Sequence, residues 1–217
     1  MKLLRRLFVA SSCRLFAAGL SLLSVCACSL LKPTPTSPPA SYVLEGGRNA
    51  APAPALAQGP TLIVNPVSAA AGFDSPRVIF VRETHRLEYF AHSAWVDPPA
   101  RMLTPLLVAA LEHTGAFRAV VLAPSSATGD LRLDTQVIRL QQEFQSQPSR
   151  VRFTLRAYLV EETTRRVLTW REFETTVAAD SDTPLGGVVA ANLAVQAVLA
   201  DLSTFCAEAT RGWEHQP

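Results

Sequence analysis

The clearest pattern in the chain is an alternation of apolar and polar residues in its second half. From 131 to 137 the odd positions are apolar or threonine and the even positions are polar, as in a β-strand with one covered face. The apolar positions then shift to Ile138 and Leu140, which predicts a β-bulge or a change of covered face. Residues 151–159 alternate without interruption, and 167–177 follows as a third strand after a polar turn.

Shorter apolar runs earlier in the chain predict further strands. Leu62–Val64 is a short run that ends at an Asn-Pro pair, as a buried strand does. Residues 77–82 and 87–92 form a pair of strands across a four-residue polar turn, and 117–122 forms another short strand.

Two segments have apolar residues at helical spacing. The first begins at Asp97, which can cap a helix before two prolines, and it ends at Gly115. Inside it, Pro105 either kinks one long helix or begins a shorter helix capped by Thr104. The second helix runs over 184–206. One of its faces holds Val188, Ala191, Val195, Val198 and Leu202, and a wider arc adds Leu185, Val189 and Leu193.

The breadth of that arc leaves two interpretations open. The helix is either buried on two sides within its own domain, which we favour, or it contacts another subunit. The succession of strands and helices predicts an α+β fold, a two-layer α/β sandwich. We expect a mixed, largely antiparallel sheet of about six strands packed against two main helices, within one domain over residues 61–208, followed by a polar tail at 209–217.

The first 27 residues have the features of a signal peptide. Four basic residues precede an uninterrupted run of apolar and small residues from Leu15 to Val25. Eleven residues are too few for a transmembrane helix, which needs roughly 20. A charged segment followed by a short apolar one is typical of a secretory signal.

The end of this segment resembles a bacterial lipoprotein box. Cys28 follows the small residue Ala27, and Val25 occupies the apolar third position before it, whereas Cys26 follows a residue too large for cleavage. The resemblance implies that Cys28 is lipidated, and several acyl chains would hold the protein on a membrane permanently. Ser29, in place of an aspartate, resembles a signal for sorting to the outer membrane.

Residues 28–60 predict a tether. Seven prolines with small and polar residues fill the stretch from Lys32 to Pro60, a composition that favours an extended chain. At ~3.1 Å per residue, the part before Tyr42 spans up to roughly 40 Å. Residues 42–44 are a possible short edge strand within it. Since Cys13 and Cys26 leave with the signal, Cys206 remains as the one unmodified cysteine, and a buried position is its favoured interpretation.

Charge excludes one class of function. The 217-residue chain carries 20 basic and 18 acidic residues, for a formal charge of +2. Four basic residues belong to the signal, so 16 basic residues face 18 acidic ones after its removal, and the charge becomes −2. This balance excludes nucleic-acid binding driven by bulk positive charge. With 48% hydrophobic residues, global disorder is excluded as well.

The search for catalytic chemistry yields little. The four histidines have no metal-ligand spacing, and no nucleophile or nucleotide-binding motif is present. Asp74, Asp97 and Asp134 are possible acid/base residues, but a turn, a helix cap and a polar sheet face explain them better. Arg150, Arg152 and Arg156 either bind an anion or form a solvated strand face, which we favour. The sequence therefore predicts no enzyme, metal or cofactor.

Several motifs resemble the ABC-type transport auxiliary lipoprotein family, the group of outer-membrane lipoproteins that includes paraquat-inducible protein C. They are Asn65-Pro66-Val67, the Gly72–Ser75 turn, the Leu87–Ala91 strand and, as the most specific, the Trp95–Leu103 block. The resemblance continues through Asp130–Leu133 and Arg171–Phe173 and covers about residues 42–206.

The resemblance implies a periplasm-facing outer-membrane lipoprotein that takes part in lipid transport. Its partners would be an inner-membrane ABC permease and ATPase and a periplasmic MCE-domain tunnel protein, and it would assemble as a homo-oligomeric ring. The candidate partner-binding residues lie in the matching motifs: Phe73, Asp74, Trp95, Asp97 and Arg101. For Trp95, packing in the core is at least as good an interpretation.

Two other functions stay open at this point. One is a structural or adaptor lipoprotein that engages an envelope-assembly enzyme or peptidoglycan. The other is a lipid-processing hydrolase, which would require a nucleophile and a base brought together by the fold.

Overall fold

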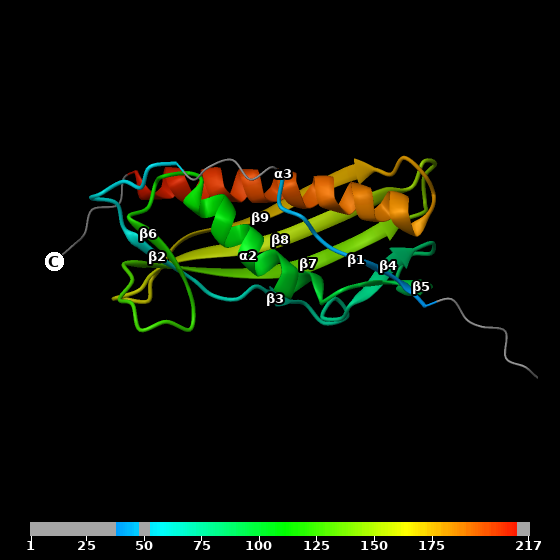
Figure 1. Cartoon of the computed structure of the whole chain (residues 1–217), viewed down its shortest axis with the longest axis horizontal. Helices are drawn as coiled ribbons and strands as arrows, with labels where there is room; N and C mark the ends of the chain where they lie inside the picture. The colour runs from blue at the N-terminus through cyan, green and yellow to red at the C-terminus, as the bar shows by residue number, and fades with distance from the viewer. Residues whose placement is uncertain (1–37, 48–52, 212–217) are drawn as a thin grey trace, which may run out of the picture. The chain divides into compact units, whose positions relative to one another are not determined.

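A computed structural model describes residues 38–47 and 53–211 (Figure 1). The signal peptide, Cys28, the tether up to residue 37 and the end of the polar tail lie outside the described residues. The chain divides into two compact units, Met1–Pro38 and Pro39–Pro217, and the fold described below is that of the second.

Three long antiparallel strands form one side of the sheet. They are β7 (Leu131–Glu143), β8 (Arg150–Glu161) and β9 (Val167–Ala178), each paired with the next along nearly its whole length. The inward positions predicted on β7 over 131–137 and on β8 are buried, because they face the helices that cover the sheet. Ile138, predicted as the next apolar position, is only half-buried, because it is the extra residue of a β-bulge. The alternating pattern thus identified these strands and their covered face correctly.

A β-bulge in β7 confirms the predicted shift of the apolar positions. The register between β7 and β8 shifts between Val137 and Arg139, so that Ile138 is the extra residue. Beyond it, Leu140 is buried while Arg139 and Gln141 are half-buried on the opposite face. The bulge keeps the covered face apolar past residue 138.

The other edge of β7 is shared by three short parallel strands. β2 (Thr61–Val64) pairs with its start, β3 (Ser68–Ala69) with its middle and β4 (Arg77–Val81) with its end. β6 (Ala119–Leu122) extends the sheet beyond β2, while β5 (Glu88–Trp95) and then β1 (Ala40–Tyr42) extend it beyond β4. The α+β class is confirmed.

The sheet has nine strands in the described part of the chain, compared with about six predicted. Strands as short as β3 are too brief to show periodicity. β1 ends at Tyr42, so the strand lies two residues before the predicted 42–44. After it the chain turns toward the last helix, where the Asn192 side chain binds the carbonyl of Val43 and the amide of Glu45.

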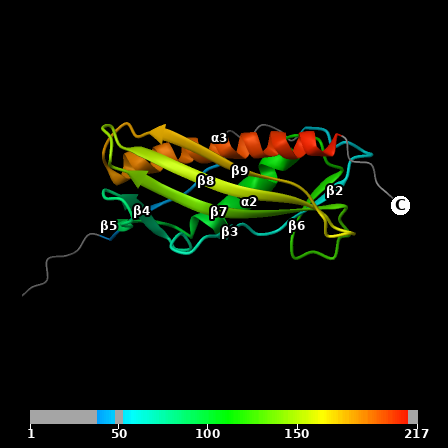
Figure 2. The ribbon, with the colours of Figure 1, turned by 180° about the vertical axis from the view of Figure 1, so that it is seen from behind.

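Both helices lie on the same face of the sheet, α2 (Pro99–Glu112) and α3 (Pro184–Thr210) (Figures 1 and 2). Pro105 lies inside an uninterrupted α2. The alternative of a shorter helix capped by Thr104 is therefore wrong, because Thr104 Oγ1 donates to the carbonyl of Ala100 one turn earlier. Asp97 does not cap the helix either, since the cap position is Pro98.

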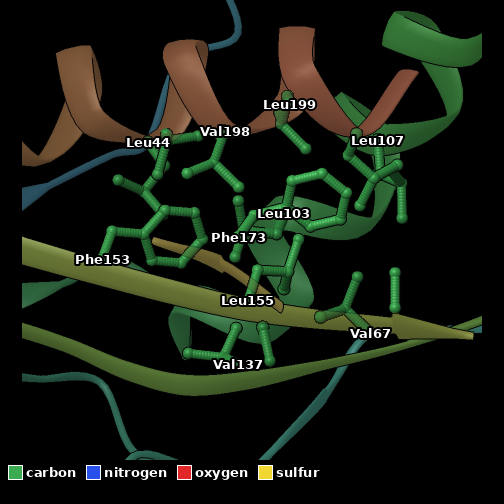
Figure 3. Close-up of a cluster of buried hydrophobic side chains, with 14 of the residues drawn as sticks. Leu44, Val67, Leu103, Leu107, Val137, Phe153, Leu155, Phe173, Val198 and Leu199 are labelled. Carbon is green, nitrogen blue, oxygen red and sulfur yellow. The ribbon is translucent and has the colours of Figure 1, made fainter. Parts of the chain in front are cut away.

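The helix α3 supplies much of the core. Figure 3 shows Val198 and Leu199 of α3 facing Phe153 and Leu155 of β8, with Leu103 of α2 beside them. By length and composition α3 could cross a membrane, with a mean hydropathy of 1.6 over its best window, but 56% of that window is buried inside the domain. Burial within its own domain, the interpretation favoured from sequence, therefore explains the face made by Val188, Ala191, Val195, Val198 and Leu202.

A polar cluster, buried at Gln142 and Ser149 and exposed at Asp182, connects the β7–β8 hairpin to the start of α3. Gln142 Nε2 donates to Ser149 Oγ at 2.8 Å, and the backbone N–H of Ser149 donates to Asp182 Oδ1 at 2.8 Å. One residue later, Thr183 caps α3 by accepting from the N–H of Gly186. These bonds fix where α3 begins over the sheet.

Candidate partner-binding surface

Four of the five predicted contact residues reach the surface. Phe73 is half-buried and Asp74 exposed in the turn between β3 and β4, while Asp97 and Arg101 form an ion pair of 3.2 Å at the start of α2. The N–H of Trp95 donates to the carbonyl of Pro76 at 2.7 Å. This bond brings the end of the 72–76 turn next to the segment that leads into α2.

Trp95 itself lies in the core. Its side chain is 5% exposed and belongs to the main apolar cluster. It presents almost no surface to a partner in this structure, which agrees with the core-packing interpretation. Because Trp95 is buried at the end of β5, it anchors the segment that leads into α2.

An apolar stripe is exposed on α3. Leu185, Val189 and Leu193 are 57%, 40% and 51% exposed and follow one another at intervals of four residues. From Pro184 to Ala200 the helix carries no charged residue. These are the residues that widened the arc in the sequence. We call this set the α3 stripe.

The segment after β1 passes beside the α3 stripe. Val43, 45% exposed, is bonded through its carbonyl to Asn192, which neighbours Leu193 in the helix. Contiguous exposed apolar surface of this kind is typical of sites of protein association. The sequence alone identified the residues but not which part of the arc reaches solvent.

The predicted arginines alternate on β8 with the buried residues that face the helices, so they lie on the opposite face of the sheet. Figure 2 views the sheet from that side. Arg152 pairs with Glu143 at 2.9 Å and Glu174 at 3.2 Å, Arg156 pairs with Glu172 at 2.8 Å, and Arg150 donates to Ser146. The hydrogen bond with Glu143 raises the pKa of Arg152, and the bond with Glu172 raises that of Arg156. These arginines thus have partners within the chain, as the solvated-face interpretation expects.

Sequence reasoning missed an aromatic pair on this same face. Tyr158 of β8 and Trp170 of β9 stack with ring centroids 6.1 Å apart, and Trp170 is 58% exposed. The two residues are direct cross-strand partners. Counting outward from the turn between β8 and β9 would have paired Tyr158 with Thr169, because the register shifts by one residue between Leu159 and Val160.

Two of the three possible acid/base residues have side-chain partners, while Asp74 is exposed in its turn. Asp134 accepts from Asn65 Nδ2 and from Arg132, and Asp97 is paired with Arg101. His85 and His92 are exposed, and the ring of His113 contacts the carbonyl of Ala109. Over residues 38–47 and 53–211, no group of three or more His, Cys, Asp or Glu residues is placed to hold a metal ion.

Cys206 is fully buried in α3, as favoured from sequence. Burial raises the pKa of its thiol to about 12. A thiol with such a pKa is protonated at neutral pH and is a poor nucleophile.

The chain resembles known proteins in both sequence and structure. A family model described as the ABC-type transport auxiliary lipoprotein component matches residues 42–203, while no curated protein matches the chain. Among solved structures, protein XCC0632 from Xanthomonas campestris has a TM-score of 0.67 and 24% identity, over 79% of this chain and 95% of that one. An uncharacterized protein has a TM-score of 0.58 and 17% identity, over 79% and 98% of the two chains. At these identities the likeness shows the shared fold.

Proposed function

The chain belongs to the ABC-type transport auxiliary lipoprotein family, and from this membership we propose that it is a docking subunit without enzymatic activity. Its place would be the periplasmic side of the outer membrane, where lipid on Cys28 anchors it. There it would bind a periplasmic MCE-domain protein, which works with an inner-membrane ABC permease and ATPase to carry lipids between the membranes.

Anchoring and docking divide between two parts of the chain. A conduit between two membranes needs a component fixed to the far one, and several acyl chains on Cys28 would supply a permanent attachment. The tether then gives the folded domain reach. This division requires no catalytic group in the domain, only a surface that binds a partner.

The observation that carries the proposed assembly of these docking subunits into a ring is the α3 stripe. A helix face with three large exposed apolar side chains and no charge over 184–200 is costly to leave in water, at roughly 25 cal/mol per Å² of apolar surface. In the proposed homo-oligomeric ring, the α3 stripe packs against the neighbouring copy. A heterologous contact of this kind closes into a ring when its rotation allows.

The contact with the MCE-domain protein would then use the exposed residues of the 72–76 turn and of the start of α2. Phe73 and Asp74 in their turn and the Asp97–Arg101 pair at the start of α2 offer one aromatic ring and charges of both signs. Mixed apolar and charged groups of this kind are common at interfaces between proteins that also exist apart.

Site-specific photocrosslinking in cells tests this assignment. A photoreactive residue at Arg101, whose side chain is 71% exposed, should crosslink to the MCE-domain protein. The control position is Arg166, which is 68% exposed in the turn between β8 and β9 and should not. Crosslinks from Arg101 to peptidoglycan or to an envelope-assembly enzyme would instead favour the adaptor function, and crosslinks to neither class would refute docking at this site.

A further inference from the structure

The face of the sheet opposite the helices has a cavity that shares only Phe73 with the proposed docking site. Its volume is about 390 Å³, and it lies between the β4–β5 turn and the last third of β7. Small-molecule sites typically have volumes of about 300–1,000 Å³. The cavity is therefore large enough for a small ligand or for one end of a larger one.

The β-bulge in β7 supplies the floor of this cavity. Because Ile138 is the extra residue, Arg139 and Gln141 both face the open side, where all three line the cavity. Bulges are common where a side chain must be aimed toward a ligand. The pairing of β4 with the end of β7 then places the Thr84–Leu87 turn beside residues 138–141 of β7.

Arg139 differs from the other arginines on this face. Arg132 pairs with Asp134 and Glu162, and Arg152 and Arg156 have the glutamate partners described above. Arg139 is half-buried, and over the described residues its side chain has no hydrogen bond or ion pair. A partly buried charge without a partner is costly, and a bound anion would offset that cost.

The remaining charged groups around the cavity also favour an anion. Arg86, Arg139 and Arg152 line it together with a single carboxylate, that of Glu143. Glu143 is neutralised by Arg152 at 2.9 Å and also accepts from Gln141 Nε2 at 2.9 Å. Arg86 is paired with Glu83 only at the surface, where both side chains are more than half exposed. Among the side chains that line the cavity, positive charge is therefore in excess. Because Arg152 also pairs with Glu174 and Arg86 pairs with Glu83, the unpaired charge is that of Arg139.

One side of the cavity is apolar. Phe73, Val81, Leu87 and Ile138 line it beside the arginines. A guanidinium group binds phosphate oxygens through paired hydrogen bonds. From this combination we propose that the cavity binds a phosphate-bearing amphiphile, with the phosphate on Arg139 and Arg86 and an apolar substituent against Phe73 and Leu87. The proposal stands apart from the docking role and does not depend on it.

Titration of the full chain carrying Cys28→Ala, which removes the lipid, tests the proposal. The probes are dihexanoyl phosphatidylglycerol below its micelle concentration, dihexanoyl phosphatidylcholine and inorganic phosphate. We expect the anionic lipid to bind more tightly than the zwitterionic one, and to shift the NMR signals of the backbone amides of Thr84–Leu87 and Ile138–Gln145.

Variants identify the residue responsible. Arg139→Gln should weaken binding of the anionic lipid at least tenfold, since a hydrogen bond to a charged group is lost. The matched control is Arg77→Gln, because Arg77 is an exposed arginine at the other end of β4 that lies over the Tyr89 ring and does not line the cavity. It removes the same charge and should leave the affinity unchanged.

Three outcomes decide the matter. Binding of the lipid but not of inorganic phosphate supports an amphiphile, whereas equal binding of both, each dependent on Arg139, supports the anion site with a free phosphate compound as its ligand. No binding of any probe, or an affinity unchanged by Arg139→Gln, overturns the proposal. If Arg139→Gln does not fold, amide shifts of the parent chain confined to residues away from the cavity lining overturn it equally.

Discussion

The side-chain oxygen of Gln142 lies directly against the backbone of Gly187, so that a β-carbon at position 187 would stand 2.2 Å from Gln142 Oε1. Gln142 is 2% exposed and its amide nitrogen is bonded to Ser149, so it cannot turn aside without breaking that bond. The glycine therefore sets how closely the first turn of α3 approaches β7. No sequence motif marks this glycine, which appears only as a residue at a helix start.

Gly187→Ala should lower the free energy of unfolding. Although alanine favours helix, the added methyl overpacks a closed site, and overpacking typically costs about 1–3 kcal/mol. Thermal or urea unfolding of the two proteins measures the difference. Gly47→Ala is the matched control, since its new β-carbon meets only the end of the Gln196 side chain at 3.4 Å. Equal stability of Gly187→Ala and the parent would contradict this account of α3 packing.

Acid should weaken the connection between the β7–β8 hairpin and α3. Hydrogen bonds from the backbone and side chain of Ser149 lower the pKa of Asp182. The unfolded chain then binds the proton first, so this contribution is present above the ordinary aspartate pKa of about 3.9 and is lost as pH falls below it. Asp182→Asn should have a lower melting temperature than the parent at pH 7, and the difference between the two melting temperatures should shrink toward pH 3. A difference of the same size at both pH values would contradict the assignment.

Cys206 should be unreactive in the folded protein. Because burial raises its thiol pKa to about 12, an alkylating reagent at pH 7.5 should modify the peptide containing Cys206 only after denaturant is added. Peptide mass spectrometry of native and unfolded samples measures this. Complete labelling of the native protein within minutes would show that α3 opens far more often than a core helix should.

Substitutions at two nearby positions on α3 should distinguish an effect on folding from an effect on assembly. Val195 is fully buried, so Val195→Glu places an unpaired charge in the core and should cost about 3–5 kcal/mol of stability. Leu193 is 51% exposed, so Leu193→Glu should keep the melting temperature of the monomer and reduce the oligomer size.

Light scattering after size-exclusion chromatography measures that oligomer size. The control is Thr204→Glu, an exposed site on the polar second half of the same helix, which should leave the size unchanged. An oligomer unaffected by Leu193→Glu would exclude the α3 stripe as the contact between copies.

Two of the long strands were predictable because they repeat one signal several times. Alternation over 131–137 and 151–159 predicted β7 and β8, the break at Ile138 located the bulge, and β9 was predicted as the strand that follows a polar turn. The short strands have no such repetition: β3 is held by the edge of β7, and β1 by its pairing with β5. The sequence left open whether Pro105 lies inside a long helix or begins a short one. A proline is tolerated inside α2 because position 105 is exposed, and only the fold reveals that exposure.

The candidate sites were predictable only in part, for a related reason. Trp95 stood out as an aromatic residue in a specific block, but burial of a side chain depends on what packs over it. The cavity at Arg139 is built from four segments that are separate in the sequence. The sequence does not show that Arg139 lacks a partner. This becomes clear only from the fold, which shows the glutamates paired with the other arginines.

Lipid anchoring has a direct test in cell fractionation. The wild-type protein should sediment with membranes, and its outer-membrane share should separate on a density gradient. Cys28→Ala removes the only cysteine that follows a small residue in the lipoprotein box, so the protein should pass to the soluble periplasmic fraction. Continued membrane retention of Cys28→Ala would mean that something other than lipid holds the chain.

Affinity purification of a tagged MCE-domain protein from detergent-solubilised envelopes tests the docking role most directly. The account predicts that the wild-type chain is enriched well above an unrelated outer-membrane lipoprotein of similar abundance. It also predicts that Arg101→Glu, which reverses an exposed charge at the proposed contact, lowers the recovery while Arg166→Glu does not. Recovery of the wild-type chain no better than that of the unrelated lipoprotein would contradict the account.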